Sequence, residues 1–281
     1  MFHELRKRGT AVRLMPPLLV AALVMAATWD AWRWYLGRVA TAPEDAATLA
    51  LIVAFVGGLG VLRRSYASEP RPVPLLLVAA VLATYAASYL VLPPIARAAI
   101  AIAATLFCLH CAAFRTRPPA AFWGLVALAL PVVPSLQFTL GYPMRLVSAA
   151  LAVGLLQMHG MGVTRQGTFL LWRGEMVQFD APCSGMNMLW AGLLLTLAVC
   201  VLFRLGPLKV ALAILLSVAL TLAANVLRAA SLFYLETGFV AHSPAWWHEG
   251  VGVAAFVVAS AVMLWSVGRM ARRDSPREAT T

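Results

Sequence analysis

The chain has 281 residues, of which 62% are hydrophobic and only 12% are charged, and its formal net charge is +11. Because this apolar share is too high for a soluble domain and the apolar residues occur in long blocks, we expect a polytopic membrane protein. The arginines lie between the blocks, which indicates topology signals and contacts with lipid headgroups, and no nucleic-acid partner is expected.

The N-terminal part of the chain contains four apolar blocks that are long enough to cross a bilayer. They are predicted at about residues 16–36, 46–62, 75–92 and 95–114. No small-residue cleavage site follows the first block, so we expect a retained span and not a removed signal peptide. The fourth block holds Cys108-x-x-Cys111 with His110 between the two thiols. A metal clip is one interpretation of that pair, but we favour buried packing.

A fifth block, at about residues 120–140, contains Pro131 and Pro134 and is predicted to be kinked. The residues Gly141-Tyr142-Pro143 are then predicted to break the helix. The apolar segment 145–158 that follows is short, so we expect it to lie at the membrane interface or to dip into the membrane without crossing it.

The composition changes after this segment. Residues 163–179 mix polar and apolar side chains around Gly167 and Gly174, which predicts short strands or a hairpin. Three more apolar blocks follow at about residues 184–203, 207–227 and 251–267, and a basic tail ends the chain.

The basic residues in the connections predict the orientation of the chain. If the basic N-terminus is cytoplasmic, four alternate connections are cytoplasmic too, and all four are basic: Arg63/Arg64, Arg115/Arg117, Arg204/Lys209 and Arg269/Arg272/Arg273. Arg33, Arg38 and Arg97 fall on or near the outer side and are exceptions to the pattern.

These patterns predict an all-α polytopic membrane fold with about eight transmembrane helices and both termini in the cytoplasm. A small extracytoplasmic β-like segment is expected before the sixth span. Three regions follow from this division: N-terminal spans at 1–119, a core with an outer-face site at 120–268, and a basic cytoplasmic tail at 269–281.

A cysteine stands where the polar segment gives way to the sixth block, in the stretch from Asp180 to Asn187. Pro182 is typical of a first helical position, so Cys183 is predicted in the first turn of the helix, at the outer face. The unpaired N–H groups of that turn favour a thiolate, whereas Asp180 would oppose it if the carboxylate lies close.

Two later stretches bring reactive side chains to the same predicted membrane face. Arg228 interrupts an apolar run, and an ionised residue there normally faces a partner or a wet cavity, although it could also extend to lipid headgroups. Asn225 shares its helical face. His248 begins the eighth block, beside two tryptophans. Glu249 adjoins it, but neighbouring residues of a helix point apart, so we assign Glu249 no orienting role.

Together the thiol, the imidazole and the guanidinium predict a cysteine acyl-transfer site. His248 would take the thiol proton and later protonate the leaving amine. Arg228 would stabilise the oxyanion and the thiolate, and Cys183 would carry a thioester that water or an amine or hydroxyl acceptor resolves. No metal and no cofactor is expected.

The same three stretches carry a family resemblance. Cys183-Ser184-Gly185, Asn225-x-x-Arg228 and His248 resemble, in order and spacing, the motifs of the exosortase/archaeosortase family, over roughly residues 120–267. The resemblance implies a multi-span cysteine transpeptidase or protease of a bacterial or archaeal cytoplasmic membrane. Its partners would be exported proteins with a C-terminal sorting signal, made of a short motif, a transmembrane helix and a basic cluster, together with the bilayer and an unknown acceptor.

Further residues are predicted to assist the site. Those near the three motifs are expected to support it: Asp180, Ser184, Asn187, Asn225 and Glu249. Those that are large and aromatic, and lie near the predicted outer face, are candidates for the wall of a substrate groove: Trp172, Trp246 and Trp247.

Three other classes compete with this interpretation. A zinc protease would need a second histidine at helical spacing from His248, and none follows. A thiol–disulfide oxidoreductase would need a paired cysteine, but Cys108 and Cys111 are predicted at the opposite face. A transporter, or an envelope or exopolysaccharide assembly scaffold without covalent catalysis, stays open as the alternative, although no inverted repeat is visible.

Overall fold

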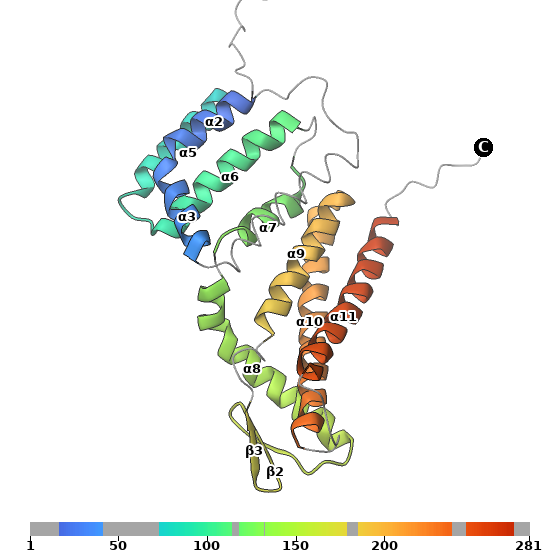
Figure 1. Ribbon diagram of the computed structural model, residues 1–281. Helices are drawn as coiled ribbons and strands as arrows, with labels where there is room; N and C mark the ends of the chain where they lie inside the picture. The colour runs from blue at the N-terminus through green and yellow to red at the C-terminus, as the bar shows by residue number, and fades with distance from the viewer. Residues whose placement is uncertain are drawn as a thin grey trace, which may run out of the picture. The chain divides into compact units, whose positions relative to one another are not determined.

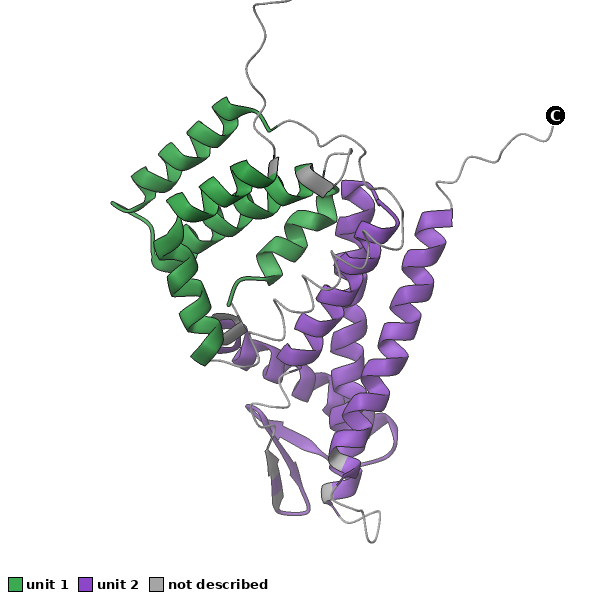
Figure 2. Ribbon diagram, turned by 45° about the horizontal axis from the view of Figure 1, so that its top comes forward, with its two compact units in different colours: residues 1–131 green, residues 132–281 purple. Residues whose placement is uncertain are grey.

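The computed structural model describes residues 17–41, 73–113, 118–131, 133–178, 185–237 and 246–272. These residues are mostly helical and include one small sheet (Figure 1). Contacts divide the chain into two compact units, unit 1 at residues 1–131 and unit 2 at residues 132–281 (Figure 2). The predicted division into regions 1–119, 120–268 and 269–281 rests on where the motifs lie and stays a prediction.

Unit 1 is organised around one long apolar helix, α6 (Pro94–Ala113). Four other helices pack against it: α2 (Pro17–Ala27), α3 (Trp29–Thr41), α5 (Leu75–Ser88) and α7 (Ala120–Leu128). Cys108 and Cys111 lie buried on α6 in an apolar cluster with Val20 and Val24 of α2, in agreement with the packing interpretation of this pair. The second predicted block, 46–62, lies outside the described residues.

The first predicted block forms two helices and not one. Thr28 separates α2 from α3, and its hydroxyl donates a hydrogen bond of 2.8 Å to the carbonyl of Val24. A threonine bonded back to the preceding turn in this way bends a helix. The segment after the bend is polar on one side, with Asp30 in its first turn and Arg38 in its last.

Residues 120–158 differ from the prediction in two places. The predicted block 120–140 is not one kinked helix, because the chain breaks near Pro131 after the short α7. The predicted break at Pro143 is absent, because one long helix, α8 (Val133–Met158), continues through it. Pro134 falls in the first turn of α8, where a missing N–H costs nothing, and an apolar helix tolerates an internal proline by bending. Segment 145–158 is therefore half of a long helix, and not a separate segment at the interface.

Four described helices are long and apolar enough to cross a membrane: Pro94–Cys111, Gln137–Met158, Pro207–Leu235 and Glu249–Arg272. Shorter apolar helices occupy Leu18–Ala27, Leu75–Ser88 and Met186–Leu202. The count of about eight crossings stays a prediction. Because α7 has 9 residues, about 13 Å, it is too short to cross a bilayer, and α8 is the candidate for the predicted fifth span.

The predicted β segment is confirmed as a three-stranded antiparallel meander of β1 (Thr164–Gln166), β2 (Phe169–Trp172) and β3 (Glu175–Gln178). Gly167, with φ of +63°, starts the first two-residue turn. Arg173 and Gly174, both with positive φ, form the second, as hairpin turns of this length require. Leu170 inserts into an apolar cluster with α8 and α10, which fixes the meander on unit 2.

Three helices complete unit 2: α9 (Met186–Leu202), α10 (Pro207–Glu236) and α11 (Trp247–Arg272). The Lys209 Nζ atom, at the start of α10, donates a 2.9 Å hydrogen bond to the carbonyl of Met270 at the end of α11. Gly192 of α9 packs on Thr221 of α10. Both α9 and α11 therefore run antiparallel to α10.

Candidate active site

One end of unit 2 collects four helix ends and the sheet. The end of α8 meets the end of α10 there, since His159 Nδ1 lies 3.1 Å from the hydroxyl of Tyr234. Gln157 Nε2 donates to the carbonyl of Val163, just before β1. Because α9 and α11 run antiparallel to α10, their N-terminal ends lie at this same end. This is the part of unit 2 to which the three sequence motifs map.

Asn225 of α10 is the buried polar centre of this end. Its side chain is 1% exposed, and its Nδ2 atom donates a 2.9 Å hydrogen bond to the Oγ atom of Ser148 on α8. Gly185 lies directly against it: a Cβ atom there would be 2.8 Å from Cγ of Asn225. Gly185 also has φ of +74°, so two independent constraints require glycine. The segment that leads into α9 is thus held on Asn225.

Arg228 lies three residues beyond Asn225, half-buried, and faces α11. A Cβ atom at Gly252 would be 2.9 Å from Nε of Arg228, so glycine lets the α11 backbone approach the guanidinium. His248 precedes Gly252 by four residues, one turn of helix, and therefore lies on the same face of α11. The backbone of α11 thus brings His248 and Arg228 to the same end of unit 2.

Several predicted site residues lie outside the described part of the structure: Asp180, Cys183, Ser184 and the side chain of His248. α9 begins at Met186 after an N-cap at Gly185, two residues later than the predicted start of this block, and the predicted position of Cys183 lies outside the described residues. Gly185, in a left-handed conformation, is the residue directly before the first turn of α9.

The remaining predicted residues differ in their surroundings. Asn187 and Glu249 are exposed, in the first turns of α9 and α11. Trp172 packs edge-on against Phe233, with ring centroids 5.9 Å apart, which makes it part of the core below the meander.

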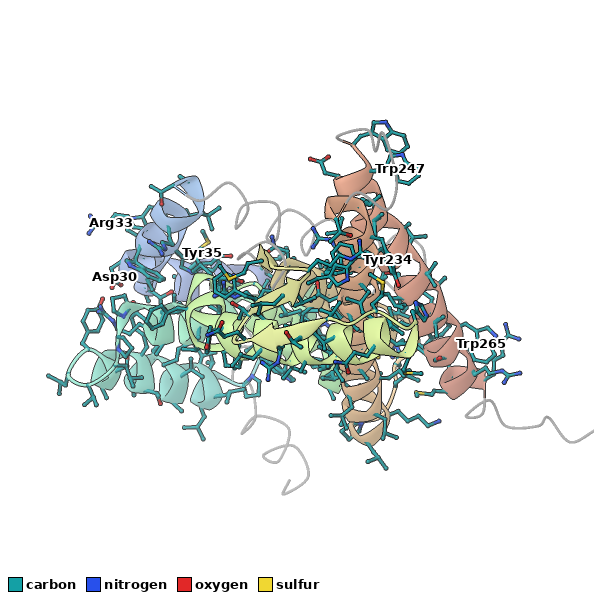
Figure 3. All side chains as sticks on the ribbon, turned by 90° about the horizontal axis from the view of Figure 1, so that it is seen from below. Asp30, Arg33, Tyr35, Tyr234, Trp247 and Trp265 are labelled. Carbon is teal, nitrogen blue, oxygen red and sulfur yellow. The ribbon has the colours of Figure 1, made fainter. Side chains whose placement is uncertain are left out.

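Trp246 and Trp247, in contrast, are 67% and 37% exposed. They form an edge-to-face pair with centroids 6.0 Å apart at the start of α11, and Figure 3 shows Trp247 projecting from that end. These two aromatics are accessible to a partner, whereas Trp172 is tied into the fold.

Sequence reasoning missed three residues that shape this end: Ser148, Gly185 as a backbone constraint, and Gly252. Gly252 carried a signal, because it follows His248 at helical spacing. Ser148 carried none, since a single serine in an apolar helix usually bonds to its own backbone.

The electrostatics of this end favour an anion. The N-termini of α9 and α11, the positive ends of the helix dipoles, both lie at this end, and Arg228 adds a full positive charge. Among the described residues in the first turn of either helix, Glu249 is acidic, and it is exposed to solvent screening. Such a setting stabilises a thiolate or an oxyanion.

The chain matches the transmembrane exosortase family over residues 40–265. It belongs to that family. The match confirms the predicted resemblance and extends it into the N-terminal part of the chain. No curated protein and no solved structure matches the chain. This exosortase is therefore a membrane-embedded protein with several apolar helices, and its three sequence motifs lie in the matched region.

Proposed function

We propose that this exosortase is a membrane cysteine protease or transpeptidase that removes the C-terminal sorting signal of exported proteins. One observation carries the proposal: Gly185 packs on Asn225 while Gly252 packs on Arg228. Gly185 follows Cys183 by two residues and Gly252 follows His248 by four, so contacts of both glycines with the helix that bears Arg228 support the proposal.

The chemistry follows from the residue types. The Sγ atom of Cys183 attacks the scissile carbonyl, and its proton passes to His248. Arg228 donates hydrogen bonds to the oxyanion of the tetrahedral intermediate. His248 then protonates the leaving amine, the C–N bond breaks, and a thioester remains on Cys183. Water yields a free carboxylate, and an amine or hydroxyl acceptor yields an amide or ester.

The substrate class comes from the family resemblance and from the position of the site. A protein with a C-terminal helix and a basic cluster would enter laterally, with its motif at the membrane surface. Trp246 and Trp247 are exposed at that end of α11 and would contact the motif. On the predicted topology the site lies on the outer face of a cytoplasmic membrane, and the basic cluster of the substrate stays inside.

The test is intact-protein mass spectrometry of a co-expressed candidate substrate that ends in a helix and a basic tail. Wild type is expected to remove the helix, and Cys183→Ala to lose processing by more than about 1,000-fold, as for a covalent nucleophile. Cys200→Ala is the matched control, because Cys200 is a fully buried thiol of α9 and should process normally. A mass increment on the new C-terminus indicates transfer to an acceptor.

Equal processing by wild type and Cys183→Ala would contradict the mechanism and would favour the transporter or scaffold alternative.

A second measurement needs no substrate. Alkylation of the native protein should label Cys183, because Cys108, Cys111 and Cys200 are all buried. Arg228→Ala is expected to slow that labelling at neutral pH, since it removes a charge that favours the thiolate.

A further inference from the structure

An open cavity of about 410 Å³ lies along one face of α3, in unit 1. Its lining residues recur at three- and four-residue spacing and so share one face of the helix: Asp30, Arg33, Trp34, Gly37, Arg38 and Thr41. The opposite face, with Ala31, Trp32 and Tyr35, is buried in the unit. Figure 3 shows Asp30 and Arg33 on the outer side of α3 and Tyr35 directed inward.

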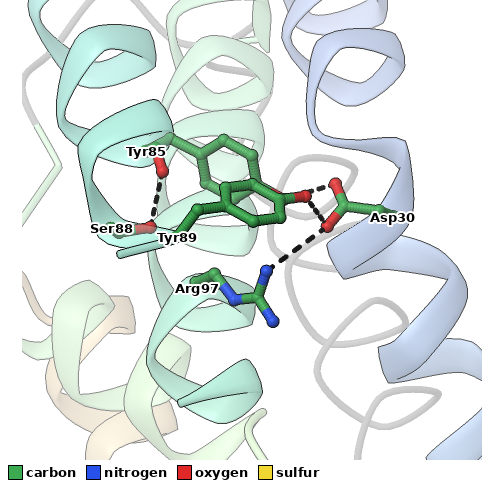
Figure 4. Close-up of polar contacts among 5 residues, drawn as sticks. All are labelled: Asp30, Tyr85, Ser88, Tyr89 and Arg97. Carbon is green, nitrogen blue, oxygen red and sulfur yellow. Dashed lines mark hydrogen bonds and ion pairs between the residues drawn. The ribbon is translucent and has the colours of Figure 1, made fainter. Parts of the chain in front are cut away.

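Asp30 is held by partners on two other helices (Figure 4). Its Oδ1 atom accepts a 2.6 Å hydrogen bond from the hydroxyl of Tyr85, and its Oδ2 atom accepts one from Tyr89. Arg97 of α6 lies 3.9 Å from Oδ2 and 4.3 Å from the ring centroid of Tyr89. The negative charge of Asp30 is therefore balanced by Arg97, and does not neutralise the other arginines of the cavity.

Arg33 and Arg38 contribute the remaining charge. Both side chains are exposed, and within the described part of the chain neither has a carboxylate at ion-pair distance. Asp30 is the acidic member of the described lining, so the cavity keeps an excess of positive charge. Gly37 lies between the two arginines in sequence, and nothing is within 4 Å of its Cβ position, so the floor is open.

The cavity lies at the end of a candidate membrane span. The contact between Asp30 and Arg97 places α3 beside the first turn of α6, whose apolar stretch starts at Pro94. Lipid phosphates occupy this boundary, and an amphipathic indole such as Trp34 is typical of it. On the predicted topology, Arg33, Arg38 and Arg97 were the exceptions to the charge rule, so orientation of the chain does not account for them.

We propose that this face of α3 binds the phosphate group of a membrane lipid headgroup. Arg33 and Arg38 both line the open cavity, and arginine is the side chain that contacts phosphate oxygens with paired N–H donors. Arg97 and the two tyrosines act as positioning residues, because they hold α3 through Asp30.

The experiment is a titration of the purified full chain in neutral detergent, followed by native mass spectrometry. The probes are dihexanoyl phosphatidylglycerol, the same lipid without phosphate (dihexanoylglycerol), and inorganic phosphate. Wild type is expected to bind the phospholipid saturably and the diacylglycerol not at all. Arg33→Gln/Arg38→Gln is expected to weaken binding by tenfold or more, about the value of one charged hydrogen bond.

Two variants separate a site from general surface charge. Gly37→Leu keeps every charge but fills the floor, and should weaken binding as strongly as the double arginine variant. Arg165→Gln removes an exposed arginine of β1 and should leave binding unchanged. Equal losses in Arg165→Gln and the double variant would overturn the proposal.

Two further results would also overturn it. Equal binding of dihexanoylglycerol would assign the affinity to acyl chains, and competition by inorganic phosphate at similar concentrations would assign the cavity to a soluble anion. Glu44 and Asp45 follow α3 in the sequence and lie outside the described residues. Binding that appears only in Glu44→Gln/Asp45→Asn would assign the arginines to the carboxylates of the chain itself. None of these outcomes depends on Cys183.

Discussion

Units 1 and 2 each contain a polar cluster among apolar helices, and the two clusters are built differently. In unit 1, Asp30 is surrounded by side chains that satisfy its charge, and none of the described glycines packs against it. In unit 2, two glycines pack so closely that a Cβ atom at Gly185 would lie within 3 Å of the Asn225 side chain, and one at Gly252 within 3 Å of Arg228. The first arrangement fixes helices to one another through their side chains. The second holds glycine backbone against polar side chains, close in sequence to the three motifs.

The strongest test of this comparison is Gly185→Ala. The methyl group would meet Cγ of Asn225 at 2.8 Å and would occupy a left-handed backbone position, so we expect processing to fall by more than about 100-fold. The matched control is Gly160→Ala, which has φ of +79° but nothing within 4 Å. It carries the same backbone strain without the collision. If both variants lost activity equally, strain and not contact with Asn225 would be the cause.

Arg228→Lys should have the next largest effect. Lysine keeps the charge but loses the planar pair of donors, so we expect a loss of about 10- to 100-fold in kcat, against about 100- to 1,000-fold for Arg228→Ala. The measurement is the rate of substrate cleavage at saturating substrate in detergent. Arg269→Lys serves as control, because Arg269 stacks on Trp265 at the other end of unit 2. A wild-type rate for Arg228→Lys would argue for charge alone.

Gly252→Ala is expected to have a smaller effect, because the colliding atom, Nε of Arg228, belongs to a side chain that can move. Alanine also favours a helix by about 1 kcal/mol, so the melting temperature should hold or rise while cleavage falls by about tenfold. Gly268→Ala on the same helix meets nothing within 4 Å and should keep full activity. A fall in melting temperature together with activity would indicate misfolding and not a displaced guanidinium.

The smallest effects are expected from variants that remove a single hydrogen bond. One such variant in each polar cluster tests whether only the cluster in unit 2 influences the reactivity of Cys183. Ser148→Ala leaves a buried donor of Asn225 without this acceptor, and Tyr85→Phe removes one donor to Asp30; each should cost about 1–3 kcal/mol of stability. Ser148→Ala should also slow the alkylation of Cys183, because Asn225 positions Gly185. Tyr85→Phe should not. Slower alkylation in both variants would mean that overall stability controls the site.

Sequence patterns predicted the membrane class, the family, the meander and the helices α6, α10 and α11, because long apolar runs and hairpin glycines are local signals. The predictions of helix boundaries failed where the tertiary contacts of a residue override its local preference for or against helix. Pro143 is tolerated within α8, and Thr28 bends a helix that hydrophobicity alone treats as continuous. The start of α9 moved because Gly185 takes a left-handed conformation against Asn225, a residue 40 positions away whose contact no local pattern encodes.

The length of α10 has a consequence for the proposed cleavage reaction. It has 30 residues, about 45 Å at the usual rise, whereas the hydrocarbon core is about 30 Å thick. Arg228 lies about 32 Å from Pro207 along the axis, so with Pro207 at the inner border of the core the guanidinium would be level with the outer border. The length of α10 would then set the distance from the membrane at which a scissile bond reaches Arg228. A substrate whose scissile bond lies too close to its membrane helix, or too far from it, would not reach Arg228. Inserting residues between the motif and the helix of the substrate would measure the permitted distance.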